Sequence, residues 1–341
     1  MRTTLVARLD SDGDVLLSGP VVRAVAASGD RVVLLVGPRG AAAARLLPGV
    51  DELLVWDCPW IAADPAPVDS ASVDALVQQI SRLAVSRALV LTSFHQSPLP
   101  LALLLRLAGV GWIGAASEDY PGSLLDLRLR LPEQGLHEVQ RSLRLAEAAG
   151  FALPEGDPGG LAVSRPLPDP APLTGDVPYV VVHPGASVPA RAPSPPWATA
   201  LVTQLAGAGH RVVVTGGPAE RALTRTVAGE HGLDLGARTT LAELAGVLDA
   251  AEAVVVGNTG PGHLAAAVGT PVVSLFAPVV PAERWRPYGV AHVLLGDQHA
   301  PCAATRARTC PVPGHPCLAG IGLPDVVAAV QSLGARPLVV A

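Results

Sequence analysis

The chain carries two successive series of short β-rich runs, with alanine-rich helical stretches between the runs. The first series comprises residues 5–7, 31–36, 52–55 and 88–91, separated by helical stretches such as 21–27 and 73–85. The second series comprises residues 179–183, 211–215, 253–257 and 272–276. Regular alternation of this kind is typical of parallel strands joined by crossover helices. We therefore expect an α/β protein with two doubly wound lobes.

A proline-rich stretch separates the two series. Residues 154–178 contain seven prolines and several glycines, a composition that favours a loop or linker. The length of 341 residues fits two domains. We place the boundary near residue 175, which gives domains 1–175 and 176–341. The last helical stretch, residues 324–333, and the apolar tail 338–340 are candidates for packing back on the first lobe.

The charge and hydropathy of the chain bear on its binding partners and its cellular location. All 24 basic residues are arginine, which is typical of GC-rich coding, and the formal net charge is −5 with no basic run. Binding to nucleic acid through phosphate neutralisation is therefore disfavoured. Neither a signal peptide nor an apolar run of about 18 residues is apparent, so we expect a cytoplasmic protein. Residues 101–110 leave peripheral contact with the inner face of the membrane as an alternative.

Two glycine turns that follow strands indicate a phosphorylated ligand. Residues 254–263 read as a buried strand, a turn and a helix start, at which Asn258 or Thr259 acts as the cap and Pro261 suits an early helical position. The unpaired N–H groups of such a helix start favour anions, commonly phosphate. A similar turn follows the strand at residues 180–183. Two turns facing one ligand predict a substrate that carries a nucleotide.

The motifs in this order resemble those of glycosyltransferase family 9, which is typified by the ADP-heptose:lipopolysaccharide heptosyltransferases. They are RLDSDGDVLL at 8–17, HPGAS at 183–187, GGPAE at 216–220, NTGPGH at 258–263 and the segment with Cys302, Cys310 and Cys317. The resemblance covers nearly the whole chain, and the motifs are specific together although each is weak alone. It implies the GT-B fold, with two Rossmann-like lobes facing across a cleft. The N-terminal lobe would bind the acceptor and the C-terminal lobe the nucleotide sugar, which is a substrate, so no cofactor is implied.

The resemblance implies that Asp14 is the general base that takes the proton from the acceptor hydroxyl. Asp10 and Asp12 lie close enough in the sequence to raise the pKa of Asp14 or to be the base instead, on the acceptor side. The alternative is that Asp14 only stabilises a helix start through its charge.

On the donor side the resemblance implies that Arg191 stabilises the leaving diphosphate. The family commonly has a lysine there, and arginine keeps the charge and adds a fork of donors. The other donor-binding candidates are Gly185, Ser187, Gly217, Glu220, Asn258, Thr259, Gly260 and His263. Glu220 would bind the ribose hydroxyls. The alternatives are a solvated loop for Arg191 and a hydrogen-bonded core histidine for His263.

Three features leave questions open. Family members usually have aspartate where this chain has Asn258, so the donor sugar is open to doubt. The spacing of Cys302, Cys310 and Cys317, with His315 between the last two, does not match a zinc knuckle, and we expect reduced thiols and no metal site. Trp285 and Tyr288 lie in a loop that either stacks on a base or sugar or pins the loop to the protein.

The resulting hypothesis is an inverting glycosyltransferase that needs no metal. It moves a sugar, a heptose by resemblance, from an ADP-linked donor to a hydroxyl of a glycan, lipid-linked or secondary-metabolite acceptor. The alternatives are a nucleotide-sugar epimerase of the same fold and a non-catalytic nucleotide-sugar binding protein. A dinucleotide dehydrogenase is weaker still, because no GxGxxG follows the first strand.

Overall fold

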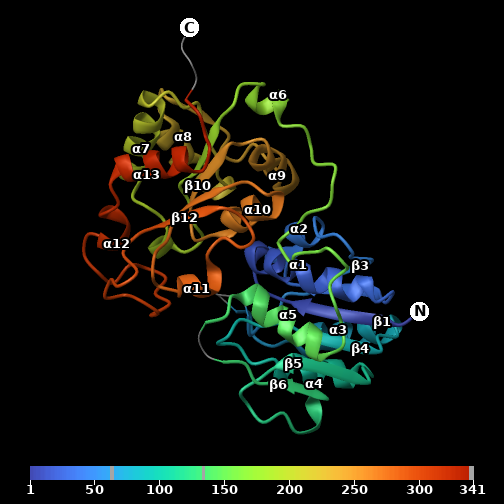
Figure 1. Cartoon of the computed structure of the whole chain (residues 1–341). Coiled ribbons are helices and arrows are strands. Elements are labelled where there is room, and N and C mark those ends of the chain that lie inside the picture. Colours follow the sequence, from blue (N-terminus) through green and yellow to red (C-terminus); the bar gives the residue numbers. More distant parts are fainter. Residues whose placement is uncertain (62–64, 133–134, 338–341) are drawn as a thin grey trace. The chain divides into compact units, whose positions relative to one another are not determined.

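The computed structural model describes residues 1–61, 65–132 and 135–337 and contains two compact units, Met1–Ser164 and Arg165–Ala341. Each unit is built on a six-stranded sheet in which the paired strands are parallel. Helices cover both faces of each sheet (Figure 1). The prediction of an α/β protein with two doubly wound units is confirmed.

The sheet of the first unit has the order β3-β2-β1-β4-β5-β6. Its strands are β1 (Thr3–Arg8), β2 (Arg31–Val36), β3 (Glu52–Val55), β4 (Arg87–Val90), β5 (Trp112–Ala116) and β6 (Leu127–Leu129). Its helical elements are α1 (Asp12–Ala27), η1 (Pro38–Gly40), α2 (Ala41–Ala44), α3 (Ser70–Arg82), α4 (Leu99–Leu107), η2 (Gly122–Leu124) and α5 (Glu138–Ala148). Helix α1 packs against α2 and α5, whereas α3 packs against α4. The strand order reverses between β1 and β4.

The sheet of the second unit has the order β12-β11-β10-β7-β8-β9. Its strands are β7 (Val180–His183), β8 (Val212–Val214), β9 (Gly232–Asp234), β10 (Ala253–Gly257), β11 (Val272–Leu275) and β12 (His292–Leu295). Its main helices are α7 (Pro195–Gly207), α8 (Arg221–Ala228), α9 (Leu241–Asp249), α10 (Gly260–Val268) and α13 (Leu323–Ser332). The short elements are α6 (Ala171–Thr174), η3 (Pro189–Arg191), η4 (Pro218–Glu220), α11 (Ala282–Trp285) and α12 (Pro316–Ala319).

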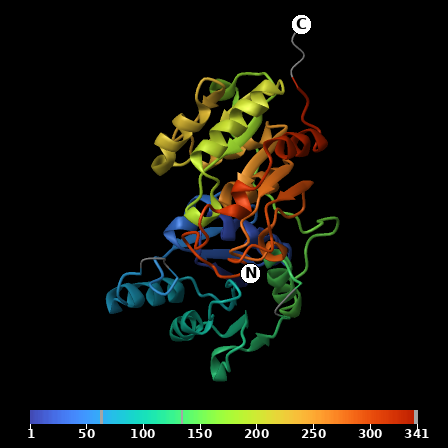
Figure 2. The ribbon, with the colours of Figure 1, turned by 90° about the vertical axis from the view of Figure 1, so that its left-hand side faces the viewer.

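The main helices of the second unit pack in two groups, one of three helices and one of two. Helix α7 packs against α8 and α13, and α9 packs against α10. Figure 2 shows α7 and α8 side by side, in yellow-green and yellow. The apolar faces of α7 and α13 close over the alternate side chains Val180 and Val182 of β7. The strand order reverses between β7 and β10.

Four strands are absent from the sequence-based expectation, namely β5, β6, β9 and β12. Strand β5 contains Gly114 and two alanines, so it has a weaker β-branched signal than its neighbours. Strands β6, β9 and β12 lie at sheet edges, and all their residues are half-buried. Such edge strands are difficult to predict from the sequence because they mix polar and apolar residues.

The boundary between the units differs from the prediction near residue 175. The units divide between Ser164 and Arg165. Arg165 forms a bidentate ion pair with Asp249 at 2.9 and 2.7 Å, and Thr174 is buried in the second unit. Residues 165–175 therefore pack on the second unit, although their proline content is typical of a linker.

The C-terminal segment was a candidate for packing back on the first lobe. Helix α13 instead packs against α7 and β11 of the second unit, where Val326 and Val330 are fully buried. The tail itself, residues 338–341, lies outside the described residues. No helix in the described part of the chain is both long and apolar enough to span a bilayer.

Candidate active site

The strand-order reversals define where each unit is built to bind. In an open parallel sheet, ligands bind beyond the carboxyl ends of the strands where the order reverses. In the first unit these ends are the segments after β1 and β4, and in the second unit the segments after β7 and β10. Every motif of the sequence except the GGPAE turn and the cysteine segment follows one of these strand ends.

In the first unit, strand β1 ends at a buried arginine that contacts three carboxylates, two of them nearby in the sequence and one from α5. Arg8 is 2 % exposed. Its guanidinium lies 3.0 Å from a carboxylate oxygen of Asp10, 2.9 Å from Asp14 and 3.9 Å from Glu138. It also donates to the Ser93 hydroxyl at 2.8 Å. These carboxylates, with the desolvation of Arg8 opposing them, leave the pKa of Arg8 above its ordinary value, so it is a permanent cation.

Asp14 is held in place at the start of helix α1. One carboxylate oxygen accepts from Arg8, and the other accepts from the Ser11 hydroxyl at 2.8 Å and the Ser11 backbone N–H at 3.4 Å. These contacts form a capping box, so the helix-start role considered for Asp14 is realised. The side chain is still 21 % exposed.

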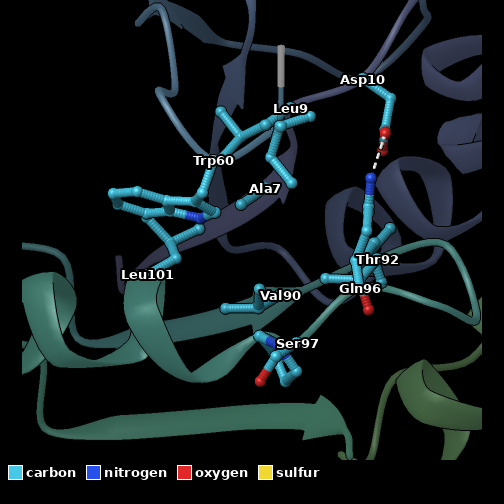
Figure 3. Close-up of a pocket in the computed structure, with 12 residues that line it drawn as sticks. Ala7, Leu9, Asp10, Trp60, Val90, Thr92, Gln96, Ser97 and Leu101 are labelled. Carbon is cyan, nitrogen blue, oxygen red and sulfur yellow. Dashed lines mark hydrogen bonds between the residues drawn. The ribbon is translucent and has the colours of Figure 1, made fainter. Parts of the chain in front are cut away.

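Asp10 lies on the other side of Arg8 and lines a pocket. Gln96 donates to its second oxygen at 2.6 Å (Figure 3). Burial raises the pKa of Asp10 above the usual range, and the charge of Arg8 opposes that rise. A carboxylate with a raised pKa is a better proton acceptor than an ordinary aspartate. Asp10 therefore stays a candidate for the base beside Asp14.

Asp12 makes different contacts. Its carboxylate accepts from the backbone N–H of Ala43 at 2.9 Å, and burial raises its pKa. This contact ties α1 to helix α2. The structure brings together Asp10 and Asp14, and it places Asp12 in a structural contact.

In the second unit, the turn after β7 meets the turn after β8. Gly185 lies so close to Glu220 that a Cβ atom at this position would overlap the carboxylate. Glu220 accepts from the backbone N–H of Gly217 at 2.8 Å, and its carboxylate is 3.7 Å from the ring of His183. Burial lowers the pKa of His183, so its ring is neutral at pH 7. Three of the predicted donor residues, Gly185, Gly217 and Glu220, thus form one cluster, while Ser187 is exposed beside it.

The turn that carries Arg191 closes over the end of β10. A Cβ atom on Gly257 would lie 2.5 Å from the carbonyl oxygen of Arg191, so only glycine fits there. The neighbouring Ala190 donates its N–H to the Arg308 carbonyl at 3.0 Å, and its carbonyl contacts the His315 ring at 3.1 Å. The cysteine segment therefore holds the Arg191 turn next to the start of α10.

The start of α10 borders a second pocket. Thr259 is the N-cap residue, and the pocket is lined by Gly257, Asn258, Thr259, Gly262, His263, Ser274, Trp285 and Pro287. The Asn258 side chain donates to the Ala277 carbonyl at 3.4 Å and accepts from the Ala277 N–H at 3.3 Å. An aspartate could accept but not donate in this pair. Asn258 therefore joins the ends of β10 and β11, which gives the departure from aspartate a structural reason. Gly260, the first residue of α10, and the buried His263 lie with Thr259 at this helix start.

The cysteines pack as apolar side chains. Cys302 and Cys317 are buried in the core of the second unit, with Cys310 packed against them. Burial raises the pKa of Cys317 to about 11, and the nearby Cys302 and Cys310 add to the rise. All four cysteines are free thiols. Among the described residues, no three His, Cys, Asp or Glu side chains are arranged to hold a metal ion.

Several site residues were missed by the sequence interpretation. Arg8 was part of a motif but had no assigned role, although a charged residue at the end of a buried strand is a signal for a functional position. Gln96 follows β4 and Glu138 begins α5, and nothing in their local sequence links them to Asp10 or Arg8. Trp60, which lines the same pocket as Asp10 and Gln96, was likewise not singled out.

Comparison with known proteins identifies relatives over most of the chain. The family model for glycosyltransferase family 9 (heptosyltransferase) matches residues 74–315. The lipopolysaccharide heptosyltransferase 1 of Pseudomonas aeruginosa is 36% identical over 183 residues, which cover 52% of this chain and 49% of that protein. The aligned segment thus spans about half the length of that relative.

Two solved structures have the same fold at low identity. A glycosyl transferase family 9 protein from Veillonella parvula superposes with a TM-score of 0.79 and 15% identity, covering 97% of each chain. The ADP-heptose lipopolysaccharide heptosyltransferase II of E. coli gives a TM-score of 0.75 and 18% identity, covering 97% of this chain and 98% of the other. The fold is thus that of the GT-B heptosyltransferases, two Rossmann-like units in one chain.

Proposed function

The chain belongs to glycosyltransferase family 9, and on this premise we propose that it is an inverting glycosyltransferase that moves a heptose from an ADP-linked donor to an acceptor hydroxyl. The observation that carries the proposal is the placement of Arg191. Its turn closes over Gly257 directly before the start of α10, at the strand-order reversal where a doubly wound sheet binds its ligand. ADP and heptose are taken from the names of the relatives.

In the proposed reaction the acceptor oxygen attacks C1 of the donor sugar. Asp14 takes the hydroxyl proton as the new C–O bond forms. The bond between C1 and the diphosphate oxygen breaks, and its electron pair leaves with ADP. Arg191 and the N–H groups at the start of α10 stabilise the charge that develops on the diphosphate. Attack from the face opposite the leaving group inverts the configuration at C1.

The remaining donor contacts follow from the two clusters of the second unit. We assign the ribose hydroxyls to Glu220, whose carboxylate is already oriented by Gly217. The diphosphate is assigned to Gly185, Ser187, Thr259, Gly260 and His263. Since the nucleotide sugar is itself the substrate, no cofactor is part of the proposal.

The place of action is proposed as the cytoplasm, with peripheral contact at the inner face of the membrane as the alternative. Helix α4 buries Leu101 and Leu105 but exposes Leu103 and Leu107. Two leucines four positions apart lie on one helix face, which supports this alternative.

The test is a binding and hydrolysis screen of the whole chain against ADP-, GDP-, UDP- and dTDP-sugars. We expect selective binding of an ADP-sugar that weakens at least ~10-fold in Arg191→Ala and is partly restored in Arg191→Lys. Slow hydrolysis should fall ~10²-fold or more in Asp14→Asn, while donor binding is kept. Arg225→Ala, at an exposed position on α8, is the matched control and should behave as wild type.

Other outcomes favour other functions. Donor binding without turnover in the presence of any acceptor would support a non-catalytic binding protein. Release of an isomerised nucleotide sugar without acceptor would support an epimerase. If no nucleotide sugar binds, or if Arg191→Ala and Asp14→Asn both match wild type, the proposal is wrong.

A further inference from the structure

The ends of β7 and β8 carry a chain of polar side chains that leads to Glu220. His183 is the last residue of β7, Thr215 directly follows β8, and both are buried. The Thr215 hydroxyl lies 3.0 Å from Nδ1 of the His183 ring, and Nε2 of the same ring lies 3.7 Å from Oε2 of Glu220. The proposed reaction uses Glu220 but gives no role to His183 or Thr215.

The charge of Glu220 sets the direction of this chain. Because burial lowers the pKa of His183, the ring is neutral, and one of its nitrogens carries a hydrogen while the other accepts. A carboxylate beside Nε2 favours the hydrogen on that nitrogen. Thr215 then donates its hydroxyl hydrogen to Nδ1, which fixes the tautomer and the orientation of the ring. The Nε2–H group thus attracts the carboxylate as a dipole, at a distance longer than a hydrogen bond.

The backbone around Glu220 leaves its carboxylate little freedom. A Cβ atom on Gly185 would overlap the carboxylate, and one on Gly216 would lie 3.2 Å from Oε2. Gly217 donates its N–H to Oε2 at 2.8 Å. Glutamate loses much rotamer freedom when it is fixed, so holding it in place before binding lowers the entropy cost of the complex.

Hydroxyl, histidine and carboxylate also form the triads of hydrolases, but this arrangement does not suit nucleophilic catalysis. Thr215 is 0% exposed, so its hydroxyl is out of reach of a substrate. Glu220 is the most exposed member of the chain, at 23%. A carboxylate only accepts hydrogen bonds, and each of its two oxygens can accept more than one. Its two oxygens match a pair of neighbouring hydroxyls, such as the 2′ and 3′ hydroxyls of a ribose.

We propose that His183 and Thr215 are positioning residues that hold the Glu220 carboxylate for a ribose with both hydroxyls, so that the site prefers ribonucleotides to deoxyribonucleotides. The inference rests on the proposed function, which assigns the ribose to Glu220. His183 acts through its Nε2–H group, and Thr215 acts through the orientation of the ring. Neither residue touches the nucleotide.

The test is calorimetric titration of the whole chain with ADP, 2′-deoxy-ADP and 3′-deoxy-ADP. The readout is the ratio of the Kd of each deoxynucleotide to the Kd of ADP. A defect that is merely structural weakens the three ligands alike and leaves this ratio unchanged. We expect a ratio of about 10 or more in the wild type, because each deoxynucleotide loses a hydrogen bond to a charged acceptor.

Two substitutions of His183 separate the roles of its ring nitrogens. The amide of glutamine can reach the place of Nε2, whereas the amide of asparagine reaches only the place of Nδ1. We expect His183→Gln to keep most of the ratio and His183→Asn to lower it ~5-fold. Thr215→Val removes the hydroxyl and keeps the shape, and it should lower the ratio ~3-fold. His231→Asn is the matched control, because His231 is exposed and lies at the amino end of β9.

Three results would overturn the inference. These are equal binding of ADP and both deoxynucleotides by the wild type, an unchanged ratio in folded His183→Asn and Thr215→Val variants, and an equal fall of the ratio in His183→Gln and His183→Asn. If ADP does not bind at all, the donor-site proposal is wrong and the inference with it.

The donor screen separates the two proposals. Turnover of an ADP-sugar that depends on Arg191, in a protein whose ADP binding ignores the ribose hydroxyls, keeps the transferase and rejects the inference. A ribose preference that depends on His183, in a protein that transfers no sugar, keeps the inference and rejects the transferase.

Discussion

Arg8 is a fully buried cation whose charge is compensated by Asp10, Asp14 and Glu138. Replacing it as Arg8→Met removes the cation that Asp10 and Asp14 pair with, while Glu138 keeps its pair with Arg141 at 3.6 Å, and breaking a buried ion pair costs about 3–5 kcal/mol. The charge of Arg8 lowers the pKa of Asp10, so in the variant that pKa rises further above its usual range. A native state with a raised carboxyl pKa binds more protons than the unfolded state, and its stability falls as pH rises. We expect a larger stability loss at pH 7.5 than at pH 5.5 in urea unfolding.

The matched control for this prediction is Arg31→Met. Arg31 pairs with Glu52, and the two side chains are 34% and 31% exposed, so the expected loss is below ~1 kcal/mol. An equal loss for the two variants, or a loss at Arg8 that does not change with pH, would contradict the account of the buried cluster.

At the residue scale, the sequence predicted candidate residues that directly follow strands. It missed the side chains from other parts of the chain that contact those residues. Asp14 and Arg191 were proposed from the family resemblance, Asp14 within a motif after β1 and Arg191 just beyond the HPGAS motif after β7. Gln96 and Glu138 were not, because their contacts with Asp10 and Arg8 depend on β4 and α5 being placed next to β1. Such pairings depend on the sheet order, which the residues do not encode locally.

At the scale of the elements, Gly185 after β7 and Gly257 at the end of β10 contact different kinds of neighbour. In Gly257→Ala the new Cβ meets the backbone carbonyl of Arg191 at 2.5 Å, so the η3 turn must move, at a cost of ~1–3 kcal/mol. In Gly185→Ala it meets only the end of the Glu220 side chain, which can rotate away and lose its hydrogen bond to Gly217, at a cost of about 1 kcal/mol. We expect Gly257→Ala to lower both the melting temperature and ADP-sugar binding more than Gly185→Ala does.

Gly207→Ala is the control for this pair, because a Cβ atom there meets no other atom within 4 Å. It should leave the melting temperature unchanged or raise it slightly. A greater loss in Gly185→Ala than in Gly257→Ala would show that the Arg191 turn does not depend on its contact with β10.

The predictability of most strands follows their burial; the exceptions are the inner strand β5, which was missed, and the edge strand β3, which was found. The strands found from the sequence include β1, β2, β7 and β10, which lie inside their sheets and read as continuous apolar runs. The edge strands β6, β9 and β12 were missed, because half-buried residues carry no such run. One helix start, that of α10, was predicted with Asn258 or Thr259 as its cap, and the N-cap residue is Thr259.

At the scale of the whole molecule, each unit has its own apolar core. The position of the boundary between the units determines which residues fold with which core. The prediction near residue 175 treated the prolines of residues 165–175 as a linker. The structure packs this segment on α9, where Gly246 has no room for a side chain because the Pro168 carbonyl lies against it. Composition alone could not show this, because proline is common both in linkers and in rigid segments that pack on a surface.

The boundary can be tested with two fragments of the second unit, residues 165–341 and 176–341. The longer fragment keeps the contact of Pro168 with Gly246 and the buried Thr174, so we expect it to melt at least ~5 °C higher in calorimetry. Arg165→Ala in the longer fragment is the control. The Arg165–Asp249 pair is 54% and 32% exposed, so its loss should cost no more than ~1 kcal/mol and leave most of the difference in place. Equal melting temperatures for the two fragments would mean that residues 165–175 act as a linker after all, and the boundary would return to residue 175.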